Sequence, residues 1–141
     1  MIIPDTSLVY RQQEIGAQWR HNFDEARHWR MMSKLSYMVN RDSGSGYFDY
    51  ARLLFSQQLR WTNPRWEIKA NARFGSYDYG VQRIGTEPLE RSYAMLDVRI
   101  ERRIGKRWLL YTAAERSWNI SNDPLDEYRD WMASGGAGFE F

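Results

Sequence analysis

The stretch WRMMSKLSYMV, residues 29–39, is the clearest indication of how this chain folds. Every second residue, from Trp29 through Leu35 to Val39, belongs to a mostly apolar series, and the residues between them are mostly polar or charged. A period of two places alternate side chains on opposite faces of a β-strand, whereas a helix needs a period near 3.6 residues. The stretch is therefore predicted to be a strand that separates an apolar environment from a polar one.

The same alternation recurs along the whole chain. We expect seven strands, over residues 13–21, 27–40, 47–62, 65–78, 91–103, 107–119 and 130–141. Asn63-Pro64 and Gly105-Lys106 are tight-turn sequences, and such short turns alternate with longer polar connections, among them 41–46, 79–90 and 121–128. Consecutive strands joined in this way predict an all-β, antiparallel up-and-down fold in a single domain, residues 1–141.

The composition narrows the class of protein. Aromatic residues make up 16% of the chain and charged residues 27%, yet the mean hydropathy is −0.73. The aromatic content argues against disorder, and no run approaches the roughly 18 apolar residues of a membrane-spanning helix. The chain has no cysteine, which excludes disulfides and thiolate metal sites. A net charge of only +2 gives no indication of nucleic-acid binding.

A strand with one apolar face can belong to a soluble barrel or sandwich, with that face inward, or to a transmembrane barrel, with that face outward. The tryptophans favour the second, because they lie on the apolar face near the strand ends, and indole rings prefer the depth of lipid headgroups. Trp108 and Trp118 are ten positions apart, which at roughly 3.3 Å per residue and a tilt of about 40° spans about 25 Å of bilayer. The predicted membrane-interface belt is Trp19, Trp29, Trp61, Trp66, Trp108, Trp118 and Trp131.

The chain ends in Gly138-Phe139-Glu140-Phe141. This alternation with a terminal Phe resembles the C-terminal assembly signal of Gram-negative outer-membrane β-barrel proteins. The resemblance implies a transmembrane barrel in the bacterial outer membrane, with the short turns in the periplasm and the long loops outside the cell. It also implies that Phe139 and Phe141 engage the barrel-assembly machinery and that lipid bilayer and lipopolysaccharide are partners. Homo-oligomerisation is compatible with it.

Seven strands is an odd number, whereas bacterial single-chain barrels have an even number. We therefore expect the chain to be the C-terminal portion of a larger barrel, and the lack of a recognisable signal peptide at Met1–Asp5 agrees with that expectation. In the alternative interpretation, residues 1–12 supply an eighth strand and close a small barrel.

The polar faces of the predicted strands indicate the function. Their ionic side chains predict a porin-like pore or export channel for polar solutes or polymers, with a weak preference for anions because bases outnumber acids. Two alternatives remain: a structural or adhesive barrel whose lumen is filled by paired charges, and a soluble lipocalin-like barrel that binds an apolar ligand. The predicted lumen-lining residues are Arg30, Lys34, Arg52, Arg60, Glu67, Lys69, Arg73, Asp97, Arg99 and Glu115.

Catalytic and metal-binding patterns are weak. His21 and His28 flank the first short turn with only Asp24 and Glu25 near them, so we expect polar turn residues rather than a metal site. An acidic group lies in the last long connection, and its spacing matches no calcium-binding loop, so we expect a solvated loop that cations bridge to lipopolysaccharide. That group is Asp123, Asp126, Glu127 and Asp130. The sequence therefore predicts no enzyme activity, no cofactor and no metal.

Overall fold

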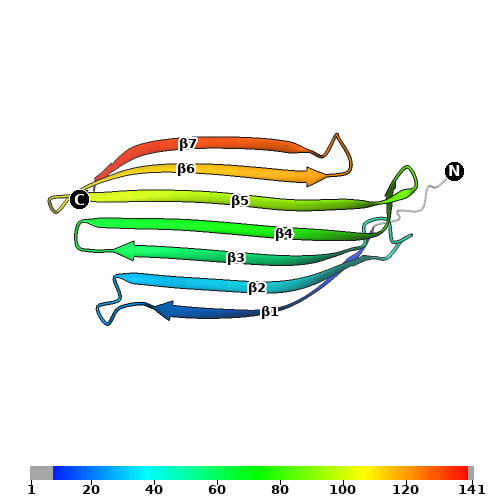
Figure 1. Ribbon diagram of the computed structural model, residues 1–141, viewed down its shortest axis with the longest axis horizontal. Coiled ribbons are helices and arrows are strands. Elements are labelled where there is room, and N and C mark those ends of the chain that lie inside the picture. The colour runs from blue at the N-terminus through cyan, green and yellow to red at the C-terminus, as the bar shows by residue number, and fades with distance from the viewer. Residues whose placement is uncertain (1–7, 140–141) are drawn as a thin grey trace.

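The computed structural model describes residues 8–139, and its seven strands form one antiparallel sheet in chain order (Figure 1). The strands are β1 (Tyr10–Asn22), β2 (Trp29–Asp42), β3 (Tyr50–Thr62), β4 (Trp66–Ile84), β5 (Glu87–Ile104), β6 (Trp108–Ser121) and β7 (Tyr128–Phe139). This confirms the predicted all-β, antiparallel up-and-down arrangement. Residues 8–139 contain no helix that is long and apolar enough to cross a membrane.

The connections divide between the two ends of the sheet, as Figure 1 shows. Turns 23–28, 63–65 and 105–107 lie at one end, which we call the turn end. Connections 43–49, 85–86 and 122–127 lie at the other, the loop end. Asn63 makes the second turn tight, because its Oδ1 accepts hydrogen bonds from the N–H groups of Arg65 (2.9 Å) and Trp66 (2.8 Å).

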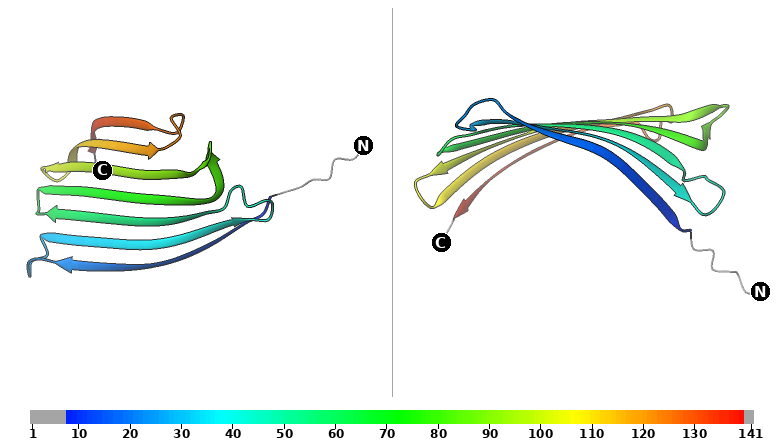
Figure 2. Two further views of the ribbon diagram at one scale, coloured as in Figure 1. Left: turned by 45° about the vertical axis from the view of Figure 1, so that its right-hand side comes forward. Right: turned by 90° about the horizontal axis from the view of Figure 1, so that it is seen from below.

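The barrel predicted from the sequence is not closed in this chain. Figure 2 shows a curved, twisted sheet with two separate edges. Among the described residues β1 pairs with β2 alone and β7 with β6 alone. In an antiparallel sheet with an odd number of strands, the first and last strands run in the same direction, so β1 and β7 cannot close it by antiparallel pairing.

The alternative eighth strand is also not formed by the described part of residues 1–12. Tyr10, Arg11 and Gln12 continue β1 and pair with Asp42, Arg41 and Asn40 of β2. Residues 1–7 lie outside the described residues.

The predicted 79–90 connection is wrong. β4 continues to Ile84 and β5 starts at Glu87, so the two strands form a long hairpin with Gly85 and Thr86 at its tip. The pairing register shifts between Asp78 and Arg83, which interrupts the two-residue alternation and explains why the sequence pattern misses these strand ends. Gly85 has φ of +62° and Thr86 does not have a positive φ, as in a type II′ turn.

Candidate functional site: the ionic face and its loop-end pocket

Strand register separates the predicted residues cleanly onto the two faces of the sheet. All ten predicted lumen-lining residues lie on one face, which we call the ionic face, and all seven tryptophans lie on the other, the apolar face. Phe139 lies on the apolar face beside Trp108, with ring centroids 4.9 Å apart. Phe141 lies outside the described residues.

The apolar face is the more exposed of the two. Its large side chains include Leu96 at 52% exposure and Trp131 at 76%. On the ionic face, by contrast, the predicted lumen-lining residues other than Lys34 and Arg73 are half-buried. Asn40, also on that face, is only 3% exposed. A soluble β-sheet protein has the opposite distribution, because water-exposed apolar area is unfavourable.

The belt tryptophans contact one another and nearby cations. Trp29 and Trp61 are opposite each other on β2 and β3, with ring centroids 6.2 Å apart. The guanidinium group of Arg102 lies 5.0 Å from the ring centroid of Trp66, and that of Arg116 lies 5.1 Å from that of Trp118. These two arginines on the apolar face thus each lie against an aromatic ring near one end of the sheet.

A partly buried polar pair lies on the apolar face between β2 and β3. Ser33 is buried and its Oγ donates a hydrogen bond of 2.5 Å to Oε1 of Gln57 on the neighbouring strand. Gln57 breaks the apolar series of β3 in the sequence, and Ser33 supplies its partner. The bond supplies the partner that the buried Ser33 hydroxyl needs among apolar neighbours.

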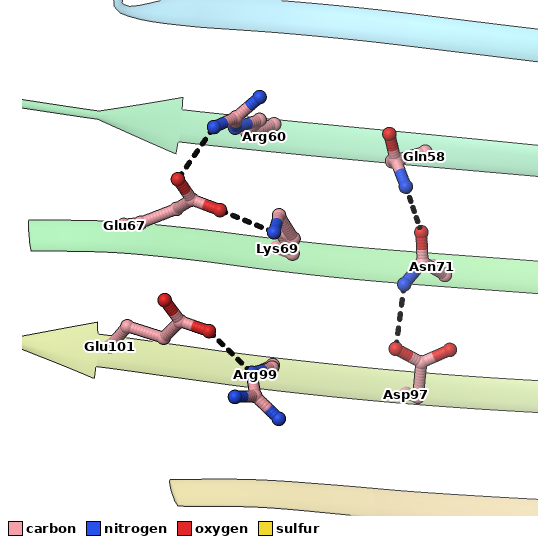
Figure 3. A network of polar contacts seen from close by, with 8 residues as sticks. All are labelled: Gln58, Arg60, Glu67, Lys69, Asn71, Asp97, Arg99 and Glu101. Carbon is pink, nitrogen blue, oxygen red and sulfur yellow. Dashed lines mark hydrogen bonds and ion pairs between the residues drawn. The ribbon is translucent and has the colours of Figure 1, made fainter. Parts of the chain in front are cut away.

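A row of cations crosses the ionic face near the turn end. Its members are Arg30, Arg60, Lys69 and Arg99, each the Cα partner of the next on β2 to β5. Like charges opposite each other destabilise a sheet. Glu67 compensates, because it accepts from Arg60 Nη2 at 2.6 Å and also from Lys69 Nζ (Figure 3). Glu101 compensates for Arg99 in the same way, at 2.6 Å.

A chain of hydrogen bonds between two amides and a carboxylate lies further along the same face. Gln58 Nε2 donates to Asn71 Oδ1 at 2.8 Å, and Asn71 Nδ2 donates to Asp97 Oδ2 at 2.6 Å (Figure 3). All these contacts link neighbouring strands or lie within one strand. They stiffen the sheet and leave the space above it open.

Three predicted lumen-lining cations, Arg30 among them, form no ion pair with a carboxylate within residues 8–139. The other two are Arg52 and Arg73. Arg52 Nη2 instead contacts Met38 Sδ at 3.7 Å. Lys34 has a weak partner in Glu14, at 3.5 Å. Asp97 and Glu115 on the same face also form no ion pair within residues 8–139, so unpaired charges of both signs lie in the middle of the ionic face.

Tyr111 is not among the site residues predicted from the sequence, yet it contacts one of them. Its ring lies 4.3 Å below the Arg99 guanidinium group. A Cβ atom added to Gly136 on β7 would come within 2.8 Å of the same ring. The glycine leaves room for the tyrosine to lie flat on the sheet. A strand pattern alone does not disclose such a pair, because the register of β6 and β7 must be known.

A cavity of about 690 Å³ lies on the ionic face at the loop end. Its lining comes from the loop-end parts of β1 to β5 and from the two longer connections, 43–49 and 122–127, so this side of the sheet is hollowed at the loop end. The lining residues are Tyr10, Gln12, Asn40, Phe48, Tyr50, Tyr79, Gln82, Leu89, Arg91 and Asp126. The sequence did not predict this pocket, because loop residues distant in the chain contribute to it.

Hydrogen bonds hold the loops around the pocket. The carboxylate of Asp42 accepts from the backbone N–H groups of Gly44, Gly46 and Phe48 at 2.8–2.9 Å. Asn122 ties the β6–β7 loop to the β4–β5 hairpin: its Oδ1 accepts from Glu90 N–H at 2.9 Å and its Nδ2 donates to the Pro88 carbonyl at 2.8 Å. The pocket walls are therefore fixed by the fold.

The first turn and the acidic loop have structural partners. His28 Nδ1 lies 3.0 Å from Asp24 Oδ2, and His21 packs edge-on against Phe23. In the acidic loop, Asp123 Oδ1 accepts from Leu125 N–H at 3.0 Å. The described residues contain no group of three or more His, Cys, Asp or Glu side chains that could hold a metal ion.

No protein-family model, curated protein or solved structure matches this chain. Its function has to be inferred from the two faces of the sheet and from the pocket.

Proposed function

We propose that this chain forms part of the wall of a water-filled passage for polar solutes across the bacterial outer membrane. The passage works by solvation alone, with no covalent chemistry. The observation that carries the proposal is the inverted sheet: an exposed apolar face with tryptophans towards both ends, and an ionic face on the concave side.

Lipid accounts for this distribution better than water does. Each exposed apolar side chain costs about 25 cal/mol per Å² in water, and that cost vanishes when acyl chains cover the face. The tryptophans then lie at the two headgroup layers. A soluble barrel with an apolar ligand would need its apolar face on the concave side, which is where this sheet carries its charges.

The two open edges of the sheet must be paired if the sheet lies in a membrane. Unpaired backbone groups of β1 and β7 cannot remain bare in hydrocarbon, so further strands must complete the barrel in the membrane. The proposal includes recognition of β7, with Phe139 near its end, by the barrel-assembly machinery. Lipopolysaccharide would border the loop end.

A second candidate is a structural barrel with a filled lumen. Arg52 is half-buried, and its Nε has no hydrogen-bond partner among the described residues. Carboxylates from an opposite wall would compensate it and fill the space. Conductance in planar bilayers separates the two candidates: the passage predicts stable channels whose anion preference falls on Arg73→Gln, and a filled barrel predicts none.

Two adjacent alanines test the orientation of the sheet. Ala113 lies on the ionic face and Ala114 on the apolar face, and the chain has no cysteine of its own. In lipid vesicles, we expect Ala113→Cys to react with a charged, water-soluble thiosulfonate and Ala114→Cys to react only with a lipid-soluble maleimide. Equal labelling of both by the charged reagent, or recovery of the chain without detergent in the aqueous fraction, would refute the membrane proposal.

A further inference from the structure

We propose that the loop-end pocket is a binding site for a neutral saccharide. The pocket lies at the mouth of the proposed passage, so the inference names the solute class and rests on the proposed function for that role.

Aromatic rings form one wall of the pocket. Tyr50 and Tyr79 lie on adjacent strands with ring centroids 5.9 Å apart, and Tyr77 stacks on Tyr79 at 6.2 Å with an interplanar angle of 14°. Tyr10 and Phe48 meet edge to face at 6.1 Å. One face of a pyranose ring presents C–H groups, which pack favourably on the electron-rich faces of aromatic rings. The phenol hydroxyls add hydrogen-bonding groups at the rim.

Planar polar side chains complete the lining. Gln12, Asn40 and Gln82 each offer an amide, and an amide can donate and accept at the same time, as adjacent sugar hydroxyls require. Gln82 is held in place because its Nε2 donates to the Tyr47 carbonyl at 2.7 Å. The side-chain amide of Gln12 forms no hydrogen bond within the described residues, so it can engage a ligand.

Asn40 gives the most specific indication that a ligand with a hydroxyl group binds in the pocket. It is 3% exposed and lines the pocket, and its Nδ2 donates to the Phe48 carbonyl at 2.8 Å. Its Oδ1 has no hydrogen-bond partner among the described residues. Buried polar atoms are nearly always paired. A hydroxyl group of a bound ligand would supply the missing donor.

The charge of the pocket selects a neutral ligand. Arg91 and Asp126 are its only ionisable lining residues apart from tyrosines, so their charges offset each other. Arg91 is already engaged, because its Nε donates to Asn119 Oδ1 at 3.0 Å and its guanidinium group lies 5.7 Å from the Tyr77 ring centroid. An anionic ligand would gain little here, in contrast to the cation row near the turn end. The volume is that of a small-ligand site.

The test is a titration of the whole chain, in detergent micelles, with maltotriose and cellotriose, and with trigalacturonate as the charged counterpart. We expect saturable binding of at least one neutral trisaccharide and weaker binding of trigalacturonate. Tyr79→Ala should weaken binding about tenfold through lost stacking. Gln12→Ala, at an exposed position that should not disturb folding, should weaken it about fivefold. The matched control is Tyr37→Ala, on the apolar face, which should stay within about twofold.

Absence of saturable binding to either neutral sugar, tighter binding of trigalacturonate, or equal effects of Tyr79→Ala and Tyr37→Ala would overturn the inference. Circular dichroism of each variant shows whether the sheet is intact. Gln12→Ala still decides the matter if Tyr79→Ala fails to fold. These outcomes are independent of the cysteine labelling of Ala113 and Ala114, so failure of the saccharide site and failure of the membrane proposal are distinguishable.

Discussion

Glu67 is the residue that compensates the cation row at the turn end. It alone accepts from both Arg60 and Lys69, which are Cα partners on adjacent strands. We expect Glu67→Gln to lower the free energy of unfolding by about 1–2 kcal/mol, because two partly buried cations then face each other uncompensated. Denaturant unfolding in micelles measures the loss, which should shrink at high salt.

Glu101→Gln is the matched control for this prediction. Glu101 is opposite Glu67 but has a single ion-pair partner, Arg99. Glu101→Gln should therefore lower the free energy of unfolding by less than Glu67→Gln does. Equal losses for the two variants, or a loss at Glu67 that does not depend on salt, would contradict the larger compensating role of Glu67.

Asp24 makes the first turn sensitive to pH. The N–H of Trp29 donates to its Oδ1 at 2.9 Å and the N–H of His28 to its Oδ2 at 3.0 Å. These bonds, that of Trp29 first, hold the pKa of Asp24 below its ordinary value. Because the pKa is lower in the folded state, the stabilisation is present above the unfolded value of about 3.9 and is lost as pH falls through the folded pKa.

Hydrogen exchange of the Trp29 amide measures this effect. We expect its protection factor to fall on acidification below about pH 4. In Asp24→Asn, the Trp29 amide should have a lower protection factor above pH 4 than in the parent. That factor should not fall on acidification, because the variant has no carboxylate to titrate at this position. An identical pH profile in the parent and in this variant would exclude Asp24 as the cause.

The β4–β5 hairpin depends on its glycine. Gly85 has φ of +62°, and an L-residue with a Cβ atom is strained there by about 1 kcal/mol. We expect Gly85→Ala to lower the stability of the hairpin by that amount. Gly80→Ala is the control, because a Cβ atom there meets nothing within 4 Å and the backbone needs no positive φ. Amide exchange in residues 79–90 should rise in the first variant only.

The predicted and observed strands agree where the two-residue alternation of apolar and polar side chains is unbroken. The pattern in 29–39 identifies β2, and because a period of two fixes which face each side chain lies on, it also places all ten predicted lumen-lining residues together. It fails at 79–90, where the register shift interrupts the period. The pocket could not be predicted either, because Phe48 and Asp126 from two separate connections and Gln82 near the end of β4 are brought together only by the folded sheet.

The whole sheet has two edges, and their direction determines how it can associate. β1 and β7 run the same way, so antiparallel closure requires an odd number of additional strands. A second copy in the same membrane orientation would instead close the barrel through two parallel seams, each between β1 of one copy and β7 of the other. Exposed edges promote such pairing, most strongly in an apolar medium.

We therefore expect the chain in detergent to form oligomers in multiples of 16.9 kDa, with an average mass that rises with concentration. Analytical ultracentrifugation with density-matched detergent measures that mass. Ile15→Lys places a charge on the β1 edge and should shift the equilibrium towards monomer, because edge lysines oppose strand pairing. Leu96→Lys, on the same face but on the interior strand β5, should leave the mass unchanged. A concentration-independent mass of 16.9 kDa with protected β1 and β7 amides would contradict the prediction, because the chain would then satisfy its own edges.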